Sequence, residues 1–329
     1  MLATSFASVP HKALSGMSQS GFLRRYLGRP YILVNTWIWN NLVASFTSSP
    51  LVRAYGDHLH HLILLRPREQ VTGTFFFRNR PELDLMVRLL AQKQHSDAVN
   101  LTVLGCSKGA EVYSISYAIR TARPDLNVNL RALDISEDVL HFAQAGVYSI
   151  KAHNGEAAPS GEGGDVHANT MKDQSSSVFE RMSSAEMDAL FDREGEEVHI
   201  KPRFRDGIAW NVGDANDLGL IGAIGLQDIV VANRFLCHMP PDEAEKCLST
   251  LSKLVKPGGY LFVSGVDLDV RTKVATKLGW RPVTEMIREV HEGDPSLRGD
   301  WPFKYWGLEP LDEGRSDWQL RYASVFQTS

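Results

Sequence analysis

The chain has 329 residues, of which 43% are hydrophobic and 22% are charged, a balance typical of a folded globular protein. Its net charge is -4 at pH 7, so bulk electrostatics give no reason to expect nucleic acid or a membrane surface as a partner. No apolar run reaches the ~20 residues of a membrane span, and the three cysteines, Cys106, Cys237 and Cys247, form no CxxC pair. We therefore expect a cytoplasmic protein without disulfides, without a metal site and without membrane insertion.

The first 70 residues predict a helical region ahead of the main domain. Apolar residues at helical spacing run from residue 21 to residue 68, and Pro30 and Pro50 divide them into two or three helices. Residues 71–80 then read Val-Thr-Gly-Thr-Phe-Phe-Phe-Arg-Asn-Arg, and Pro81 opens a helix over residues 82–93. Phenylalanines packed on the sheet edge would leave Arg78 free to reach a carboxylate. An aromatic hinge with a surface arginine fits the same segment equally well.

A buried strand, a glycine turn and a helix follow between residues 99 and 119. The apolar run over 101–104 ends at Gly105, Gly109 comes after Cys-Ser-Lys, and helical spacing begins there. Such a unit places backbone N–H groups at the carboxyl end of a parallel strand, where open α/β sheets bind ligands. The spacing G-x-x-x-G differs from the dinucleotide fingerprint G-x-G-x-x-G. Cys106 within the turn fits better as a small residue than as a nucleophile.

Glu111 lies in the first turn of this helix, where it would compete with a pyrophosphate for the helix N-terminus. A carboxylate there suits a ligand that carries an ammonium group. S-adenosylmethionine (AdoMet) has such a group, together with a carboxylate that N–H donors can bind. The alternative is an acid that is favoured at this position by the helix dipole alone.

The second strand, residues 127–133, ends at Asp134, which lies 25 residues after Gly109. An acid at this strand tip can accept hydrogen bonds from both ribose hydroxyls of a nucleoside, although it can also serve only as a turn former. Ser136 is the expected N-cap of a helix over 137–145. Residues 152–177 are poor in apolar residues and predict a mobile insertion.

The rest of the chain continues the alternation of strands and helices. A short helix is expected over 184–192 and extended segments over 198–202 and 207–212, the last leading to Asp214-Ala215-Asn216, which could grip an adenine edge. The apolar strand 228–232 predicts burial on both faces. After it we expect a helix over 242–255, a turn over 256–259, a strand over 260–264, a helix over 271–278, a capping loop over 294–318 and a last strand over 322–326. The pattern favours a doubly wound α/β sheet.

Taken in order, several segments resemble the chemotaxis-receptor (CheR-type) methyltransferase family, whose members transfer methyl from AdoMet to receptor glutamates. Residues 72–78 look like its threonine, asparagine, phenylalanine and arginine signature, and residues 109–115 are similar to its Gly-Glu-Glu-Pro-Tyr-Ser-Ile segment. Residues 132–136 and 143–148 resemble its Asp-Ile and Ala-x-x-Gly-x-Tyr pieces. The resemblance implies a class I methyltransferase fold with a Rossmann-like sheet of seven strands over 71–329, in which 184–212 form a small accessory subdomain.

The resemblance also implies roles for single residues. Arg78 would bind the methionine carboxylate, Glu111 the ammonium group and Asp134 the ribose, while Asp214 and Ala215 would flank the adenine. The implied cofactor-binding set is Thr74, Arg78, Gly105, Cys106, Gly109, Glu111, Asp134, Ile135, Asp214, Ala215 and Asn233. The candidate catalytic residues are Asn233, Arg234 and His238.

Two departures from the family lie beside the expected acceptor. The family has Arg-Asn after the fourth strand and a tyrosine five residues beyond that arginine, whereas this chain has Asn233-Arg234 and then His238.

We expect an AdoMet-dependent methyltransferase that acts on a carboxylate, either a protein glutamate or a small-molecule acid, or on a nearby polar nucleophile. The alternatives are a small-molecule O- or N-methyltransferase with His238 as base and a non-catalytic AdoMet-binding module. The oligomeric state is left open.

Overall fold

The computed structural model describes residues 29–43, 49–64, 68, 73–94, 98–150, 177–217 and 219–328. By its internal contacts the chain divides into two compact units, one of residues 1–66 with 300–310 and one of residues 67–299 with 311–329. The insertion expected at 152–177 lies outside the described residues except for Ser177. The domain boundaries expected from the sequence stay a prediction.

The smaller unit contains α3 (Arg29–Ile38), the π-helical turn η2 (Trp39–Val43) and α4 (Pro50–Leu64). Its buried cluster consists of Trp39, Leu59 and Trp301, with Tyr55 and Phe303 packed against it. The indole of Trp301 meets that of Trp39 edge-on, with ring centroids 5.3 Å apart. Residues 300–310 therefore belong to this small aromatic core, although the sequence places them in a capping loop.

The larger unit is built on a seven-stranded sheet with the order β6-β2-β1-β7-β8-β10-β9. Its strands are β1 (Ala98–Leu104), β2 (Asn127–Asp134), β6 (Ala209–Val212), β7 (Gln227–Val231), β8 (Val255–Phe262), β9 (Arg281–Pro282) and β10 (Val325–Gln327). The first five pair in parallel, and β10 is antiparallel to both of its neighbours. The predicted class I methyltransferase fold is confirmed.

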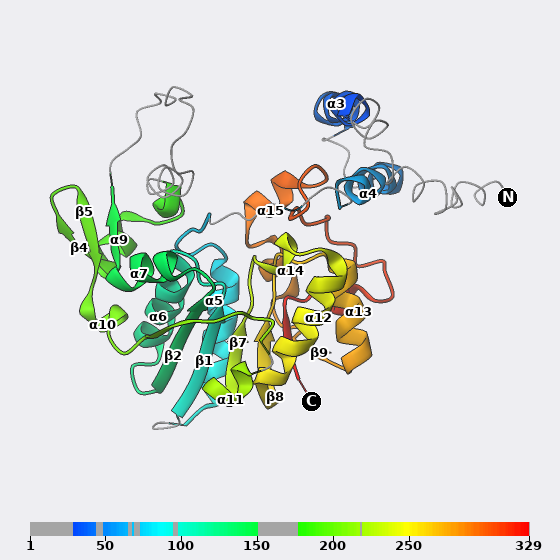
Figure 1. The fold of residues 1–329 in the computed structure, drawn as a ribbon. Coiled ribbons are helices and arrows are strands. Elements are labelled where there is room, and N and C mark those ends of the chain that lie inside the picture. Colours follow the sequence, from blue (N-terminus) through cyan, green and yellow to red (C-terminus); the bar gives the residue numbers. More distant parts are fainter. Residues whose placement is uncertain are drawn as a thin grey trace. The chain divides into compact units, whose positions relative to one another are not determined.

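The direction of winding reverses between β1 and β7, and this reversal decides where the helices lie. The chain passes from β1 through α6 (Ala110–Ala122) to β2, and from β7 through α12 (Pro241–Leu251) to β8. These two crossovers run toward opposite edges of the sheet, so right-handed connections place α6 and α12 on opposite faces, as Figure 1 shows. A crevice is thereby left at the carboxyl ends of β1 and β7.

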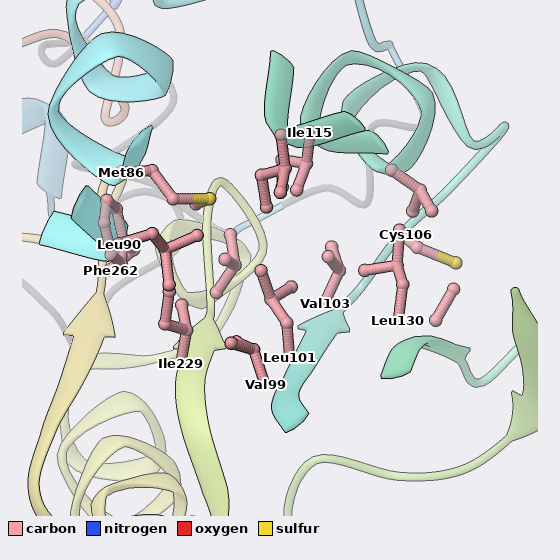
Figure 2. Close-up of a cluster of buried hydrophobic side chains, with 14 of the residues drawn as sticks. Met86, Leu90, Val99, Leu101, Val103, Cys106, Ile115, Leu130, Ile229 and Phe262 are labelled. Atoms are coloured by element: carbon pink, nitrogen blue, oxygen red, sulfur yellow. The ribbon is translucent and has the colours of Figure 1, made fainter. Parts of the chain in front are cut away.

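The main core lies between the sheet and the helices α5 (Arg80–Leu89) and α6 (Figure 2). Val99, Leu101 and Val103 alternate along β1 and are fully buried, facing Met86 of α5 and Ile115 of α6 in this cluster. Burying side chains of this size stabilises a fold by about 1.5–3 kcal/mol each. The core therefore holds the start of α6, and with it the glycine turn, against the sheet.

A second, three-stranded sheet has the order β3-β5-β4 and consists of β3 (Val147–Ser149), β4 (Phe191–Glu194) and β5 (Glu197–Ile200). The turn η5 (Ser177–Phe179) and helices α9 (Ser184–Leu190) and α10 (Pro202–Arg205) flank its last two strands in the chain. The fully buried ring of Phe76 stacks on Phe179 and meets Tyr148 and Phe191 edge-on. The phenylalanine segment is thus anchored in the aromatic core of this small sheet, not on the edge of the main sheet as expected.

The helices predicted over residues 137–145 and 271–278 are present as α7 (Glu137–Ala145) and α13 (Leu268–Leu278). The other described elements are α11 (Leu220–Ile224), α14 (Ile287–Glu292), α15 (Pro295–Asp300), α16 (Trp318–Tyr322), and the 3-10 turns η4 (Leu90–Gln92), η6 (Leu236–His238) and η7 (Ser252–Leu254). None of the described helices combines the length and the apolar character needed to span a bilayer.

Two local predictions were wrong, both near the C-terminal edge of the sheet. Residues 256–259 lie inside β8 and not in a turn, because the backbone N–H of Gly258 donates to Thr328 and that of Thr328 to Gly259. The left-handed φ of +76° at Gly258 and the register shift against β7 let the strand continue through a turn-like sequence. Tyr322 ends α16 instead of opening the last strand, which begins at Val325.

Candidate functional site

A cavity of about 790 Å³ opens in the larger unit, at the carboxyl ends of the parallel strands. Its wall includes Gly105 after β1, Asp134 at the end of β2, Gly213 after β6 and Asn233 after β7. Twelve of the thirteen predicted site residues line it: Thr74, Arg78, Gly105, Cys106, Glu111, Asp134, Ile135, Asp214, Ala215, Asn233, Arg234 and His238. Residues far apart in the chain thus meet at the topological switch point of the sheet.

Gly109 is the predicted residue that does not line the cavity. It is the N-cap of α6 with φ +82°, and a Cβ there would lie 3.1 Å from Ala143 and 3.2 Å from Tyr113. The position therefore needs glycine for its left-handed backbone and for close packing of the helix start. Its contribution to the site is the shape of the turn.

The rest of the turn also has an unusual backbone. Gly105 has φ +63°, and a Cβ at this position would lie 2.9 Å from the ring of Phe235, so a side chain is excluded. Ser107 has φ +48°, and its N–H donates to Oδ2 of Asp134 at 2.9 Å. The thiol of Cys106 is buried in the main core, and this burial raises its pKa well above the ordinary value. Such a thiol does not ionise near neutrality and is no candidate nucleophile.

Asp134 accepts a backbone hydrogen bond on each carboxylate oxygen. Ser107 N–H donates to Oδ2 and Ser136 N–H donates to Oδ1 at 3.1 Å. Each carboxylate oxygen offers two lone-pair sites, so a second donor can reach both. The side chain is therefore held rigidly at the cavity with acceptor capacity left over.

Arg78 reaches the cavity from the segment before α5. Its Nη2 donates to the carbonyl of Gly73 at 2.8 Å, and its guanidinium lies 5.1 Å from the centre of the Phe75 ring. Burial and the neighbouring Arg234 lower the pKa of Arg78 to about 10, so it stays charged at neutral pH. Its Nε is buried and has no hydrogen-bond partner among the described residues. Arg78 is thus a positively charged side chain that is fixed in position and has an unused hydrogen-bond donor, Nε.

Asn233 connects two carboxyl groups of the cavity wall, those of Glu82 and Glu111. Its Nδ2 donates to Oε1 of Glu111 at 2.8 Å and to Oε1 of Glu82 at 2.7 Å. Its Oδ1 accepts from the N–H of Ser264 at 2.8 Å and from the Ser264 hydroxyl at 2.9 Å. Asn233 therefore uses its whole hydrogen-bonding capacity within the wall and supports the two carboxylates.

Arg234 follows Asn233 with a left-handed φ of +68°. Gly265 makes room for it, since a Cβ there would lie 2.6 Å from Cδ of Arg234. Nη1 of Arg234 lies 3.4 Å from Oδ2 of Asp294 without forming a hydrogen bond, while Oδ1 of Asp294 accepts from Arg181 at 2.8 Å. One buried carboxylate is thereby shared between two guanidinium groups.

Glu82 and Asp294 are two charged wall residues among those that the sequence analysis missed. Glu82 stands in the first turn of α5 after Pro81, where an acid is expected for the helix dipole alone. Asp294 lies in a stretch assigned to a capping loop. Neither had a local signal, because Glu82 reaches Asn233 over 151 positions and Asp294 reaches Arg181 over 113 positions.

Comparisons with known proteins agree with this architecture. A family model described as "CheR methyltransferase, SAM binding domain" matches residues 72–156, and one described as "Methyltransferase domain" matches residues 160–263. No curated protein sequence matches the chain significantly.

Solved methyltransferase structures are similar only at low identity. The CurJ carbon methyltransferase is 13% identical with a TM-score of 0.35, and the match covers 75% of this chain and 53% of that one. The magnesium protoporphyrin IX methyltransferase ChlM from Synechocystis PCC 6803, with bound SAM, is 15% identical with a TM-score of 0.33, covering 85% of this chain and 90% of that one. The amino pentose methyltransferase CalS10 from Micromonospora echinaspora is 16% identical with a TM-score of 0.29, covering 56% and 49%. The chain thus spans about half the length of CurJ and of CalS10.

The strand order, the cavity at its switch point and the two family matches agree with one another. The residues of the wall also suit the cofactor, because an unused guanidinium donor and a carboxylate complement a zwitterionic amino-acid group. The chain is therefore an AdoMet-dependent methyltransferase of class I fold, and its residues 72–156 are similar to the SAM binding domain of CheR methyltransferases.

Proposed function

We propose that this methyltransferase methylates a carboxylate, either a glutamate of a protein or a small-molecule acid. The proposal is carried by Arg234, which lines the cavity and whose buried Nη1 has no hydrogen-bond partner among the described residues. Within the part of the chain that the structure describes, its ion-pair neighbour is Asp294, which already accepts from Arg181. A guanidinium held at a cavity with open donors is suited to a carboxylate, which it can bind in a bidentate manner.

In this proposal the cofactor is oriented as the family resemblance implies. Arg78 would bind the methionine carboxylate and Glu111 the ammonium group; both residues line the cavity, and Glu111 accepts a hydrogen bond from Asn233. Asp134 would accept from the ribose hydroxyls. Asp214 and Ala215 would flank the adenine, and the remaining wall would be supplied by Thr74, Gly105, Cys106, Ile135 and Asn233.

The chemistry asks little covalent help from the chain. AdoMet supplies an electrophilic methyl group on a sulfonium centre, and a carboxylate acceptor is already ionised at neutral pH and needs no general base. The protein must hold the acceptor oxygen in line with the methyl group and keep water away. In this proposal Arg234 orients the acceptor, and Asp294 and Gly265 hold Arg234 in place.

A second candidate function is methylation of an amine or phenol with His238 as the base. It is favoured by one observation, namely that His238 ends η6 and lines the same cavity as Arg234. An amine or phenol must lose a proton during transfer, and histidine is the side chain that titrates near neutrality. The two candidates differ in which residue meets the acceptor.

Methyl transfer from AdoMet with a tritium-labelled methyl group separates these candidates. The purified protein is incubated with one acceptor class at a time: carboxylic acids, glutamate-containing peptides, amines and phenols. Methyl esters hydrolyse in mild alkali and release volatile labelled methanol, whereas N-methyl and aryl ether products retain the label. Volatile label formed with acids or peptides supports the proposal. Label that survives alkali on an amine or phenol, with none on acids, contradicts it and favours the second candidate.

A further inference from the structure

Glu82 is a carboxylate in the cavity wall for which neither the fold nor the family resemblance supplies a role. Its side chain comes from α5, only 5% of the residue is exposed, and its Oε1 accepts from Asn233 at 2.7 Å. Its second oxygen, Oε2, is shielded from solvent and has no hydrogen-bond partner among the described residues. A buried polar atom without a partner is uncommon in folded proteins and calls for an explanation.

The orientation of the Asn233 amide settles which atoms meet. The backbone N–H of Ser264 can only donate, so the atom of Asn233 that it contacts must be the carbonyl oxygen Oδ1. The Nδ2 group therefore faces the other way, toward Glu82 and Glu111. One amide group thus holds two carboxyl groups side by side.

These two carboxyl groups cannot both be ionised in the wall of an empty cavity. Among the described residues, no lysine, arginine or histidine nitrogen lies within ion-pair distance of either one, and like charges in a desolvated site oppose each other. Burial, together with repulsion from Glu111, raises the pKa of Glu82 to about 8. Glu82 is therefore the member of the pair that holds a proton at neutral pH.

The surrounding charges lie on several elements. Glu111 on α6 and Asp294 before α15 raise the pKa of Glu82, whereas Arg271 on α13 lowers it. Burial also raises the pKa of Glu111, but the hydrogen bond from Asn233 and the charges of Arg78 and Arg234 oppose this rise and favour its ionised form. One added positive charge beside Glu111 would therefore favour loss of the proton from Glu82.

We propose that Glu82 is the second carboxylate of the amino-acid end of the cofactor site: it positions Asn233 and Glu111 as a neutral acid, and it releases its proton when an ammonium group docks against Glu111. The inference rests on the proposed ammonium-binding role of Glu111. The O–H bond of the Glu82 carboxyl breaks, its electron pair stays on the carboxylate, and the proton passes to bulk solvent. The ligand class is a primary ammonium group beside a carboxylate.

Calorimetric titration measures this proton directly. S-adenosylhomocysteine, which keeps the amino-acid group, is titrated into the protein at pH 7 in buffers of different ionisation enthalpy. An opposite charge within about 4–6 Å lowers a carboxyl pKa by about 1–3 units, so we expect release of roughly half a proton to one proton per ligand bound. Glu82→Gln keeps an acceptor for Asn233 and should bind the ligand without this release.

Two controls make the result specific. Asp84→Asn removes an exposed carboxylate from the same helix and should leave proton release unchanged. 5′-Methylthioadenosine keeps the nucleoside but lacks the amino-acid group, so it should release no proton from the unaltered protein. Equal proton release with both ligands, or in Glu82→Gln, would overturn the proposal.

Difference infrared spectroscopy provides a measurement that needs no variant. Binding of S-adenosylhomocysteine should remove the absorption band of a protonated carboxyl group from the unaltered protein, and 5′-methylthioadenosine should leave it. Ligand binding without loss of that band overturns the proposal even if Glu82→Gln does not fold. Both measurements use the cofactor site alone, so they succeed or fail independently of which acceptor is methylated.

Discussion

The N–H of Ser107 donates to Oδ2 of Asp134 at 2.9 Å and so ties the glycine turn after β1 to the tip of β2. Ser136 N–H donates to the other oxygen of the same carboxylate at 3.1 Å. Asp134 is therefore part of the turn's structure as well as of the cavity wall. A substitution at position 134 is therefore expected to affect the stability of the fold as well as cofactor binding.

Asp134→Ala should weaken AdoMet binding and also lower the melting temperature of the ligand-free protein. The ribose hydroxyls lose their proposed acceptor, which we expect to cost more than tenfold in affinity, about 1.4 kcal/mol. Two N–H donors also lose a charged acceptor, and hydrogen bonds to charged groups contribute roughly 1.5–3 kcal/mol each. Calorimetric titration and thermal unfolding measure the two effects. Unchanged AdoMet affinity would remove Asp134 from the ribose role.

Arg234→Lys should lower kcat/KM for a carboxylate acceptor at least about tenfold and leave AdoMet affinity nearly unchanged. Lysine keeps the charge but cannot present two parallel donors to a carboxylate. Arg288→Lys, at an exposed position with a Glu313 partner, is the matched control and should retain full activity. Equal acceptor kinetics in Arg234→Lys and in the unaltered protein would contradict bidentate binding of the acceptor.

Gly265→Ala should reduce turnover, because its new methyl group would displace Arg234. The added Cβ would lie 2.6 Å from Cδ and 2.9 Å from Cα of Arg234. Gly195→Ala is a matched control, since Gly195 has φ +63° against +59° at Gly265, yet a Cβ there meets nothing within 4 Å. Both variants lose stability through the left-handed backbone. Only Gly265→Ala is expected to lower kcat for methyl transfer, and equal kcat values would show that Arg234 tolerates displacement.

The stability of the ligand-free protein should depend on Glu82 between pH 5 and pH 8. The folded-state pKa of Glu82 is about 8, raised from 4.5 by burial and by Glu111. A raised pKa means that its contribution is fully present below pH 4.5 and is lost as pH rises toward 8, by at most about 1.4 kcal/mol per pH unit. Glu82→Gln avoids this loss, so its melting temperature relative to the unaltered protein should rise over that range and then level off.

Thermal unfolding of Glu82→Gln and of the unaltered protein at several pH values measures this difference in melting temperature. Asp84→Asn, on the exposed face of the same helix, serves as the control for the loss of an acid. Melting curves of Glu82→Gln and of the unaltered protein that shift in parallel with pH would show that Glu82 is ionised in the folded state.

Local sequence patterns and the family resemblance predicted the fold class and twelve of the residues that line the cavity. Buried strands, helical spacing, paired glycines and acids after strands are local patterns, and parallel strands bring their carboxyl ends to one edge of a sheet. Glu111, Asp134 and Asp214 were accordingly placed at the site before any contact was known. Because these patterns are local, they also led to the wrong prediction of a turn at residues 256–259. The Lys-Pro-Gly-Gly segment there is turn-like on its own and becomes part of a strand only by pairing with Thr328.

The connections among the polar groups of the wall arise from long-range contacts that appear only in the folded chain. Asn233 meets Glu82 and Glu111 across 151 and 122 positions, and Asp294 meets Arg181 across 113 positions. No periodicity encodes such contacts, because they depend on which helix packs on which face of the sheet. The proton on Glu82 has the same origin: burial and a second carboxylate determine it, and both exist only after the chain has folded.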